Sequence, residues 1–169
     1  MAPAPPLAAK RGFPPVVDAN TRVLVLGSLP GEASLAVRQY YGNPRNAFWR
    51  LMEGVIGAPL APLAYEARLA TLLEHGVGLW DVIAEAEREG SLDAAIRDPA
   101  TNDLQALIET LPALRCVAFN GGAAAKLGAR LIGERTPTIA LPSSSPAYAA
   151  RSFGEKADVW ARLKTFLVS

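Results

Sequence analysis

Residues 23–31 read Val-Leu-Val-Leu-Gly-Ser-Leu-Pro-Gly, an apolar run that ends in a turn of small residues. The run is short and has no polar alternation, which is typical of a parallel strand buried on both faces. In open α/β sheets, ligands bind outside the carboxyl ends of such strands. Residues 39–49, Gln-Tyr-Tyr-Gly-Asn-Pro-Arg-Asn-Ala-Phe-Trp, follow closely and add aromatic and amide side chains. This segment therefore predicts the fold class and the place of a binding site.

Further strands and helices alternate along the rest of the chain. Strands are predicted at residues 22–27, 77–83, 115–120 and 138–141. Helical patterns cover 46–56, 63–74, 103–111, 121–132 and about 153–167, whereas 90–98 reads as a loop or a short helix. Alternation of this kind predicts an α/β fold whose parallel sheet is covered by helices on both faces.

The composition suits one folded domain. A chain of 169 residues, half of them apolar, can bury a sizeable core. The proline-rich start predicts a flexible tail over residues 1–11 and a single domain over 12–169. No apolar run approaches the roughly 20 residues of a membrane span. The lone cysteine, Cys116, excludes an intramolecular disulfide, and we expect a cytoplasmic monomer.

The near-neutral net charge hides an asymmetry. Residues 51–112 contain eleven acidic and three basic residues, a net −8, while the remainder carries +9. The basic remainder holds nearly every candidate site segment, so a polyanionic partner is plausible. Uneven scatter along the chain is the plainer reading. Arg38, Arg45, Lys126 and Arg151 are the candidates for phosphate contacts, and the acidic segment is expected to face away.

The small-residue turn and the tyrosines after it each allow two readings. Residues 27–31 match neither a dinucleotide fingerprint nor a Walker loop. They form either an ordinary tight turn or a turn whose Ser28 and backbone N–H groups receive a phosphate. Tyr40 and Tyr41 are either packing residues or rings that stack on a flat ligand.

Polar residues at the predicted strand ends are similarly ambiguous. Asp81 could accept a ring N–H or cap a following helix. Asn120 could contact a ligand or serve as a turn residue. Asn46 could be only a helix N-cap. After the last strand, the hydroxyls of residues 143–145 could hold phosphates, and Tyr148 could enter a base stack, unless this loop is an ordinary surface turn.

Several chemistries are not expected. The only histidine, His75, reads as the solvated end of a helix, so a histidine-activated serine or cysteine nucleophile is not predicted. No spacing suits metal ligands, and we expect neither a metal nor another cofactor.

The motifs resemble the uracil-DNA glycosylase superfamily, and within it the hypoxanthine-DNA glycosylase branch. The run Gly-Ser-Leu-Pro-Gly-x-x-Ser-Leu is followed by Gln-Tyr-Tyr-Gly-Asn-Pro-Arg-Asn-x-Phe-Trp, and then by Gly-Leu-Trp-Asp-Val, Phe-Asn-Gly and Leu-Pro-Ser-Ser-Ser-Pro-Ala. The resemblance covers nearly the whole chain from about Gly12. It implies a three-layer α/β/α sandwich around a four-stranded, mainly parallel sheet.

Two departures from the superfamily pattern change the expected catalytic group. The usual Asp or Asn of the first motif is Leu29, and the last motif has no histidine. Both losses recur in the hypoxanthine branch, which implies a relocated group. Asn43 or Asn46 is the nearest candidate for the catalytic group that holds the attacking water, and Asp81 is the next; Asn120 or Asp81 would read the edge of the base. The resemblance implies substrate contacts from Gly27, Ser28, Leu29, Pro30, Gly31, Tyr40, Tyr41, Trp80 and Asn120, and DNA contacts from Arg45, Ser143, Ser144, Ser145, Pro146, Ala147 and Tyr148.

The resulting hypothesis is a monofunctional glycosylase that flips uracil or hypoxanthine out of DNA and hydrolyses its N-glycosidic bond. No lysine lies in the motifs, so no Schiff base is expected. The residues leave two alternative functions open. The protein could be a non-catalytic binder of damaged DNA, or an α/β enzyme that acts on a small nucleotide.

Overall fold

A four-stranded parallel sheet forms the centre of the computed structural model, which describes residues 9–168. The strand order is β3 (Val77–Asp81), β2 (Val23–Gly27), β6 (Cys116–Asn120) and β7 (Thr138–Leu141), and all three pairings are parallel. The α/β prediction is confirmed. Because the strands are parallel, their carboxyl ends meet along one edge of the sheet.

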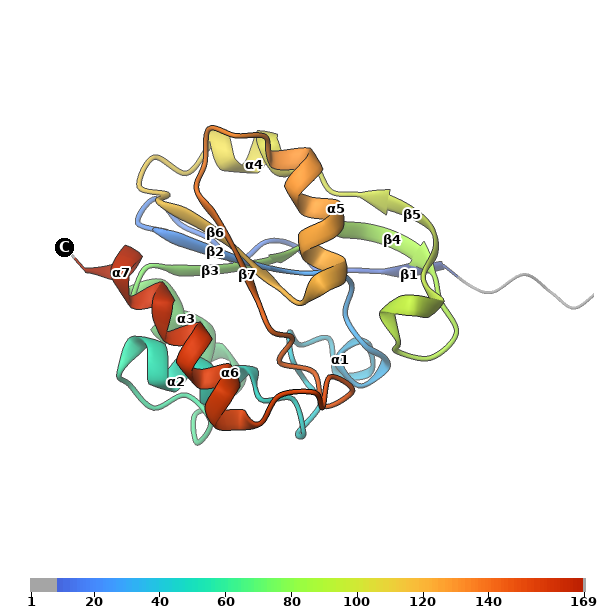
Figure 1. The fold of residues 1–169 in the computed structure, drawn as a ribbon, viewed down its shortest axis with the longest axis horizontal. Helices are drawn as coiled ribbons and strands as arrows, with labels where there is room; N and C mark the ends of the chain where they lie inside the picture. Colours follow the sequence, from blue (N-terminus) through green and yellow to red (C-terminus); the bar gives the residue numbers. More distant parts are fainter. Residues whose placement is uncertain (1–8, 169) are drawn as a thin grey trace, which may run out of the picture.

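Helices cover both faces of this sheet, which gives three layers (Figure 1). Successive residues of β2 point to opposite faces, so Val23 and Val25 join one core cluster while Leu24 and Leu26 join the other. The first cluster packs against α2 (Phe48–Ile56), α3 (Tyr65–Glu74) and α6 (Phe153–Trp160), and the second against α4 (Leu104–Glu109) and α5 (Gly122–Ile132). Because every residue of the strand is apolar and neighbouring side chains point to opposite faces, both faces of the sheet are covered by a core and a helical layer.

The predicted last helix is divided. A short 3-10 turn, η2 (Ala161–Leu163), separates α6 from α7 (Lys164–Leu167). A further short helix, α1 (Glu32–Val37), follows the turn after β2 and was not predicted. Among the residues described, no helix is both long enough and apolar enough to span a bilayer.

A second, antiparallel sheet extends from the edge of the main one. It contains β1 (Ala9–Arg11), β4 (Ile83–Glu87) and β5 (Arg97–Thr101), in the order β1-β4-β5. The prediction of one strand over 77–83 was wrong, because β3 ends at Asp81 and the chain turns away at Val82. Residues 90–98 were expected to be a loop or a short helix, and the short 3-10 helix η1 (Asp93–Ala95) lies there, although β5 already begins at Arg97.

The boundary of the predicted tail also shifts. Residues 9–11 were expected in the tail, but they form β1 and pair with residues 85–87 of β4. Lys10 reinforces the pairing, since its Nζ donates to the Gly90 carbonyl at 2.6 Å and lies 3.0 Å from a Glu32 carboxylate oxygen. Residues 1–8, the rest of the predicted tail, lie outside the described part of the chain.

Candidate active site

A pocket of about 370 Å³ lies at the carboxyl ends of all four parallel strands. Its wall includes the turn after β2, Asp81 at the end of β3, the residues after Asn120 of β6 and the loop after β7. Both Asn43 and Asn46 line it, as do Tyr40 and Tyr41. The predicted strand-end site is therefore brought together from segments that are distant in sequence.

The turn after β2 is held by hydrogen bonds to the loop between β4 and β5. The hydroxyl of Ser28 donates to Asp93 Oδ1 at 2.6 Å, and the backbone N–H of Glu32 donates to Ser91 Oγ at 2.8 Å. The Leu29 side chain is buried against Ile83 and Ala86. A leucine at this place therefore packs the hairpin onto the turn and does not face the pocket with a polar group.

Asp81 is a buried carboxyl group at the pocket wall. Its Oδ2 has no hydrogen-bond partner among the described residues. A Cβ added at Gly27 would lie only 2.6 Å from Asp81 Oδ1, so glycine is required beside it. Burial, and next the Asp93 carboxylate, raise the pKa of Asp81 to about 7, although the Arg88 guanidinium opposes this rise. The side chain is thus poised between its acid and carboxylate forms near neutral pH.

Strand β4, and not a helix, follows Asp81, so the helix-cap reading is wrong. The backbone oxygen of Asp81 accepts a bond from Asn102 Nδ2 at 2.8 Å, which fixes the chain at this point. The carboxyl group itself stays free for another partner.

Tyr41 lies between the aromatic core and the polar wall. Its ring stacks on Phe48 with centroids 3.8 Å apart, and its hydroxyl accepts a bond from Asn120 Nδ2 at 3.3 Å. The backbone of Tyr41 is left-handed, with φ 54°, an uncommon conformation for a tyrosine. Tyr40, in contrast, is almost fully buried where it reaches the wall, and its hydroxyl donates to the Pro14 carbonyl at 2.9 Å, so packing is its main contact.

Asn120 fixes the loop that follows β7. Its Oδ1 accepts from the backbone N–H of Ser144, and its Nδ2 donates to Ser144 Oγ, both at 2.9 Å. The left-handed position belongs to Gly121, with φ 101°, where an added Cβ would crowd Ser143 at 3.1 Å. Asn120 is therefore a strand residue with a bonded side chain, and the turn conformation predicted for it falls on the next residue.

The segment with both asparagines is held by its own side chains. Asn43 Oδ1 accepts from the Arg45 N–H, and Asn46 Oδ1 accepts from the Phe48 N–H, each at 3.0 Å. The second bond satisfies the first N–H of α2, but the N-cap position is Ala47, so Asn46 is not the N-cap that was predicted. The backbone N–H of Ala47 donates to the Ser144 carbonyl at 3.0 Å, which ties this segment to the serine loop.

The serine loop presents hydroxyls and one exposed aromatic ring. Ser143 Oγ accepts from the Ser145 N–H, and Ser145 Oγ accepts from the Ala147 N–H. Because these hydroxyls act as acceptors, their own protons remain available to donate to a ligand. Tyr148 lies at the end of the loop and is 38% exposed.

Two predicted residues lie outside the pocket wall. Trp80 points to the opposite side of β3 from Asp81, packs on the second core cluster and donates its Nε1 hydrogen to the Phe13 carbonyl at 3.0 Å. The geometry of the pocket therefore gives no support to the predicted contact of Trp80 with substrate. Arg45 lies between two residues that line the pocket, Asn43 and Asn46, but its own side chain is exposed and does not line the wall.

The prediction missed parts of the wall: Ala33 and Ser34 of α1, the start of α5 at residues 121–123, and residues 91–93, which are the most distant in sequence from any predicted site segment. Residues 91–93 lie within the acidic segment that was expected to face away, and that expectation was wrong for this loop. A serine, a leucine and an aspartate in an irregular connection carry no periodicity or motif, so no sequence signal marks them. Among the residues described, no group of three or more His, Cys, Asp or Glu side chains is arranged to hold a metal ion.

Comparison with known proteins identifies the family. The model of the uracil DNA glycosylase superfamily matches residues 14–164. The chain belongs to this superfamily. Two proteins named hypoxanthine DNA glycosylase are similar to it. The one from Methanosarcina acetivorans is 49% identical over 138 residues (82% of this chain and 87% of the relative), and the one from Methanosarcina barkeri is 42% identical over 152 residues (90% and 96%).

A solved structure shares the fold. The solution NMR structure of a candidate uracil DNA glycosylase from Methanosarcina acetivorans superimposes with a TM-score of 0.84 at 44% identity, covering 94% of this chain and 99% of that one. The three-layer fold expected from the superfamily resemblance is therefore confirmed. Among the described residues, Asp81 and Asp93 are the carboxyl groups that line the pocket.

Proposed function

We propose that this chain is a monofunctional DNA glycosylase that flips a deaminated base, hypoxanthine first and uracil second, into the strand-end pocket. It would hydrolyse the N-glycosidic bond and so initiate base excision repair. The observation that carries the proposal is the buried Asp81 carboxyl group near Tyr41, one oxygen of which has no hydrogen-bond partner within residues 9–168. The preference for hypoxanthine is supported by the names of the two Methanosarcina relatives.

Asp81 would read the edge of the flipped base. Hypoxanthine and uracil both present a ring N–H beside a carbonyl oxygen. A protonated carboxyl group offers one acceptor and one O–H donor, which match that edge. As the bond to the sugar breaks, the base leaves as an anion, and the O–H of Asp81 would stabilise the charge that develops on its oxygen. The raised pKa of Asp81 supports this role.

Tyr41 and the asparagine segment would complete the reaction site. The face of Tyr41 opposite Phe48 would stack on the base. An amide of Asn43 or Asn46 would hold the water that attacks the sugar. Because an amide is a poor base, the transition state would be dissociative, with a cationic sugar. No lysine is among the residues that line the described pocket, which supports hydrolysis without a Schiff base.

The hydroxyls of Ser143 and Ser145 would bind the phosphates on either side of the flipped nucleotide. The Ser28 hydroxyl, which was a candidate for phosphate binding, would not donate to a phosphate, because its proton is already directed to Asp93. We further propose that the protein works as a cytoplasmic monomer, for which the buried free thiol of Cys116 is the supporting observation. Light scattering of the purified protein tests the monomer.

A labelled duplex with one hypoxanthine, uracil or xanthine tests the function. The expected result is alkali-dependent cleavage at hypoxanthine or uracil that is unchanged by EDTA. A bandshift without cleavage would indicate a binder of damaged DNA. Neither cleavage nor a bandshift would favour an enzyme that acts on a small nucleotide. Loss of cleavage on chelation would contradict the absence of a metal.

A further inference from the structure

Two large apolar side chains are exposed at the mouth of the pocket. Leu92 is 60% exposed and Tyr148 is 38% exposed, and both line the wall. The loop of Leu92 is bonded to the turn after β2, whereas Tyr148 follows β7, and β6 lies between these strands. The two side chains therefore border the mouth from opposite sides.

A buried cation supports each of them. Lys156 Nζ donates to the Tyr148 carbonyl at 2.8 Å and lies 5.3 Å from the centre of its ring. Arg88 is the second, only 1% exposed, and it supports the loop that carries Leu92. Among the described residues, these are the two basic side chains that are buried. Burying a cation is costly unless hydrogen bonds satisfy it, so both contacts indicate an ordered mouth.

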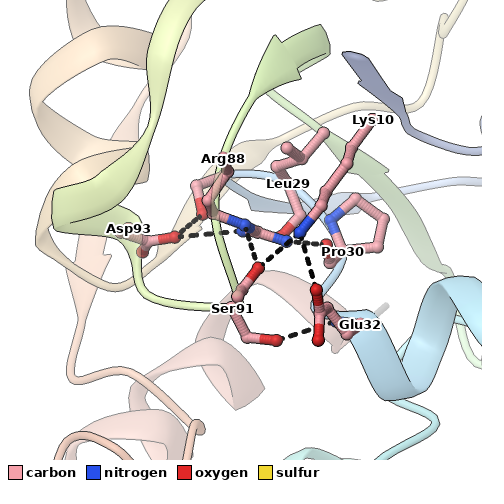
Figure 2. Close-up of polar contacts among 9 residues, drawn as sticks. Lys10, Leu29, Pro30, Glu32, Arg88, Ser91 and Asp93 are labelled. Carbon is pink, nitrogen blue, oxygen red and sulfur yellow. Dashed lines mark hydrogen bonds and ion pairs between the residues drawn. The ribbon is translucent and has the colours of Figure 1, made fainter. Parts of the chain in front are cut away.

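Figure 2 shows the support of the Leu92 loop. Arg88 Nε donates to the Gly90 carbonyl at 3.0 Å, and its two terminal nitrogens reach the carbonyls of Leu29 and Pro30. Nη1 also lies 3.9 Å from Asp93 Oδ1. The guanidinium thus joins the hairpin loop to the turn after β2.

The residues on both sides of Leu92 are bonded to that same turn. Ser91 accepts from the Glu32 N–H and Asp93 accepts from the Ser28 hydroxyl. The side chains of both neighbours are thus hydrogen-bonded, whereas the Leu92 side chain is 60% exposed. An exposed apolar side chain on a loop that hydrogen bonds hold in place is suited to insertion into another apolar surface.

We propose that Leu92 is a second wedge that enters the base stack of duplex DNA, opposite Tyr148, when the damaged nucleotide leaves the stack. The inference rests on the proposed function and extends it to the acidic half of the chain. Apolar side chains inserted between base steps compensate for lost stacking and hold the duplex open. Arg88 is then a positioning residue, because it acts on DNA only through the loop that it holds.

The test compares Leu92→Ala with Leu92→Met and with the control Val168→Ala. Val168 is also an exposed aliphatic residue, at 64%, and lies in a different cavity from the site. Single-turnover excision is measured on a duplex and on a single strand with the same base. We expect Leu92→Ala to slow duplex excision about tenfold and to leave the single strand unchanged, because only a duplex must be unstacked. Leu92→Met and Val168→Ala should act like the parent.

A second readout follows base flipping directly. With 2-aminopurine beside the damaged base, the fluorescence increase on binding should be smaller for Leu92→Ala than for the parent. Unchanged excision and fluorescence on the duplex, or equal losses of excision on both substrates, would overturn the wedge. A parent protein that excises no base from either substrate would instead contradict the proposed function.

Discussion

Asn120 and Ser144 exchange two hydrogen bonds, one through the backbone N–H of Ser144 and one through its hydroxyl. Both residues are buried, and the pair joins the end of β6 to the loop after β7. The same asparagine donates to the Tyr41 hydroxyl, and the Ser144 carbonyl accepts from the Ala47 N–H. One buried pair therefore links three segments of the pocket wall.

Ser144→Ala should destabilise the protein and slow excision. The substitution leaves the Asn120 Nδ2 without its nearest acceptor in a buried place, which costs about 1–3 kcal/mol. Urea unfolding and single-turnover excision measure the two effects. Ser143→Ala is the matched control for the unfolding measurement alone, because Ser143 is half-buried and does not bond to Asn120, whereas its hydroxyl has a proposed role in phosphate binding. Equal unfolding free energies for the parent and Ser144→Ala would contradict the importance of the pair.

Excision should fall as pH rises through the pKa of Asp81. If the protonated carboxyl reads the base, its population decreases about tenfold per pH unit above pH 7. A rate profile from pH 5 to 9 measures this. Asp81→Asn cannot ionise but keeps one donor and one acceptor, so its profile should lack that fall. A parent rate that increases through the same range would indicate that Asp81 acts as a carboxylate.

The same carboxyl should make stability depend on pH. Its pKa is about 7 in the folded protein and about 3.9 when unfolded. Between these values the folded state binds more protons, so the free energy of unfolding decreases as pH rises from about 4 to 7. Asp81→Asn should therefore lose less stability than the parent between pH 5 and pH 8 in urea titrations.

The parts of the fold that the sequence predicted are those with local signals. The buried run at residues 23–27 and the apolar stripe at residues 48–56 each follow from spacing alone. The β4–β5 hairpin has no such signal, because Ala84 to Glu87 alternates only weakly and the partner strand contains a proline. Its place depends on Arg88 and Leu29, whose burial arises from contacts that are distant in sequence. For the same reason, Ser91 to Asp93 could not be assigned to the site.

Asn43→Ala or Asn46→Ala should slow single-turnover excision about a hundredfold, since a misplaced water can cost that much. The two changes are distinguishable by stability. The Asn46 side chain also accepts the Phe48 N–H at the start of α2, so its loss should lower the free energy of unfolding by about 1 kcal/mol. Circular dichroism confirms folding before the rates are compared. If both variants keep rates near the parent's, the water is held by another group.

Tyr41→Ala should weaken binding of the flipped base by about 1–3 kcal/mol, the usual contribution of one aromatic stacking partner. Tyr41→Phe is the control, because it keeps the ring on Phe48 and removes only the bond from Asn120. Binding of an uncleavable analogue of the damaged nucleoside in DNA measures both. Equal losses for the two variants would assign the effect to the hydroxyl and not to stacking.

DNA binding should weaken steeply as salt concentration rises, because the segments outside residues 51–112 carry a net +9. Removal of one true phosphate contact should make the log–log slope shallower by about one. Arg38, Arg45, Lys126 and Arg151 are the positions to neutralise, and all four are exposed. Arg130→Gln is the matched control, because it lies one turn further along α5 from the pocket than Lys126. A slope near zero in the parent would contradict a polyanionic substrate. A shallower slope for Arg130→Gln would indicate that the DNA also contacts α5 one turn beyond Lys126.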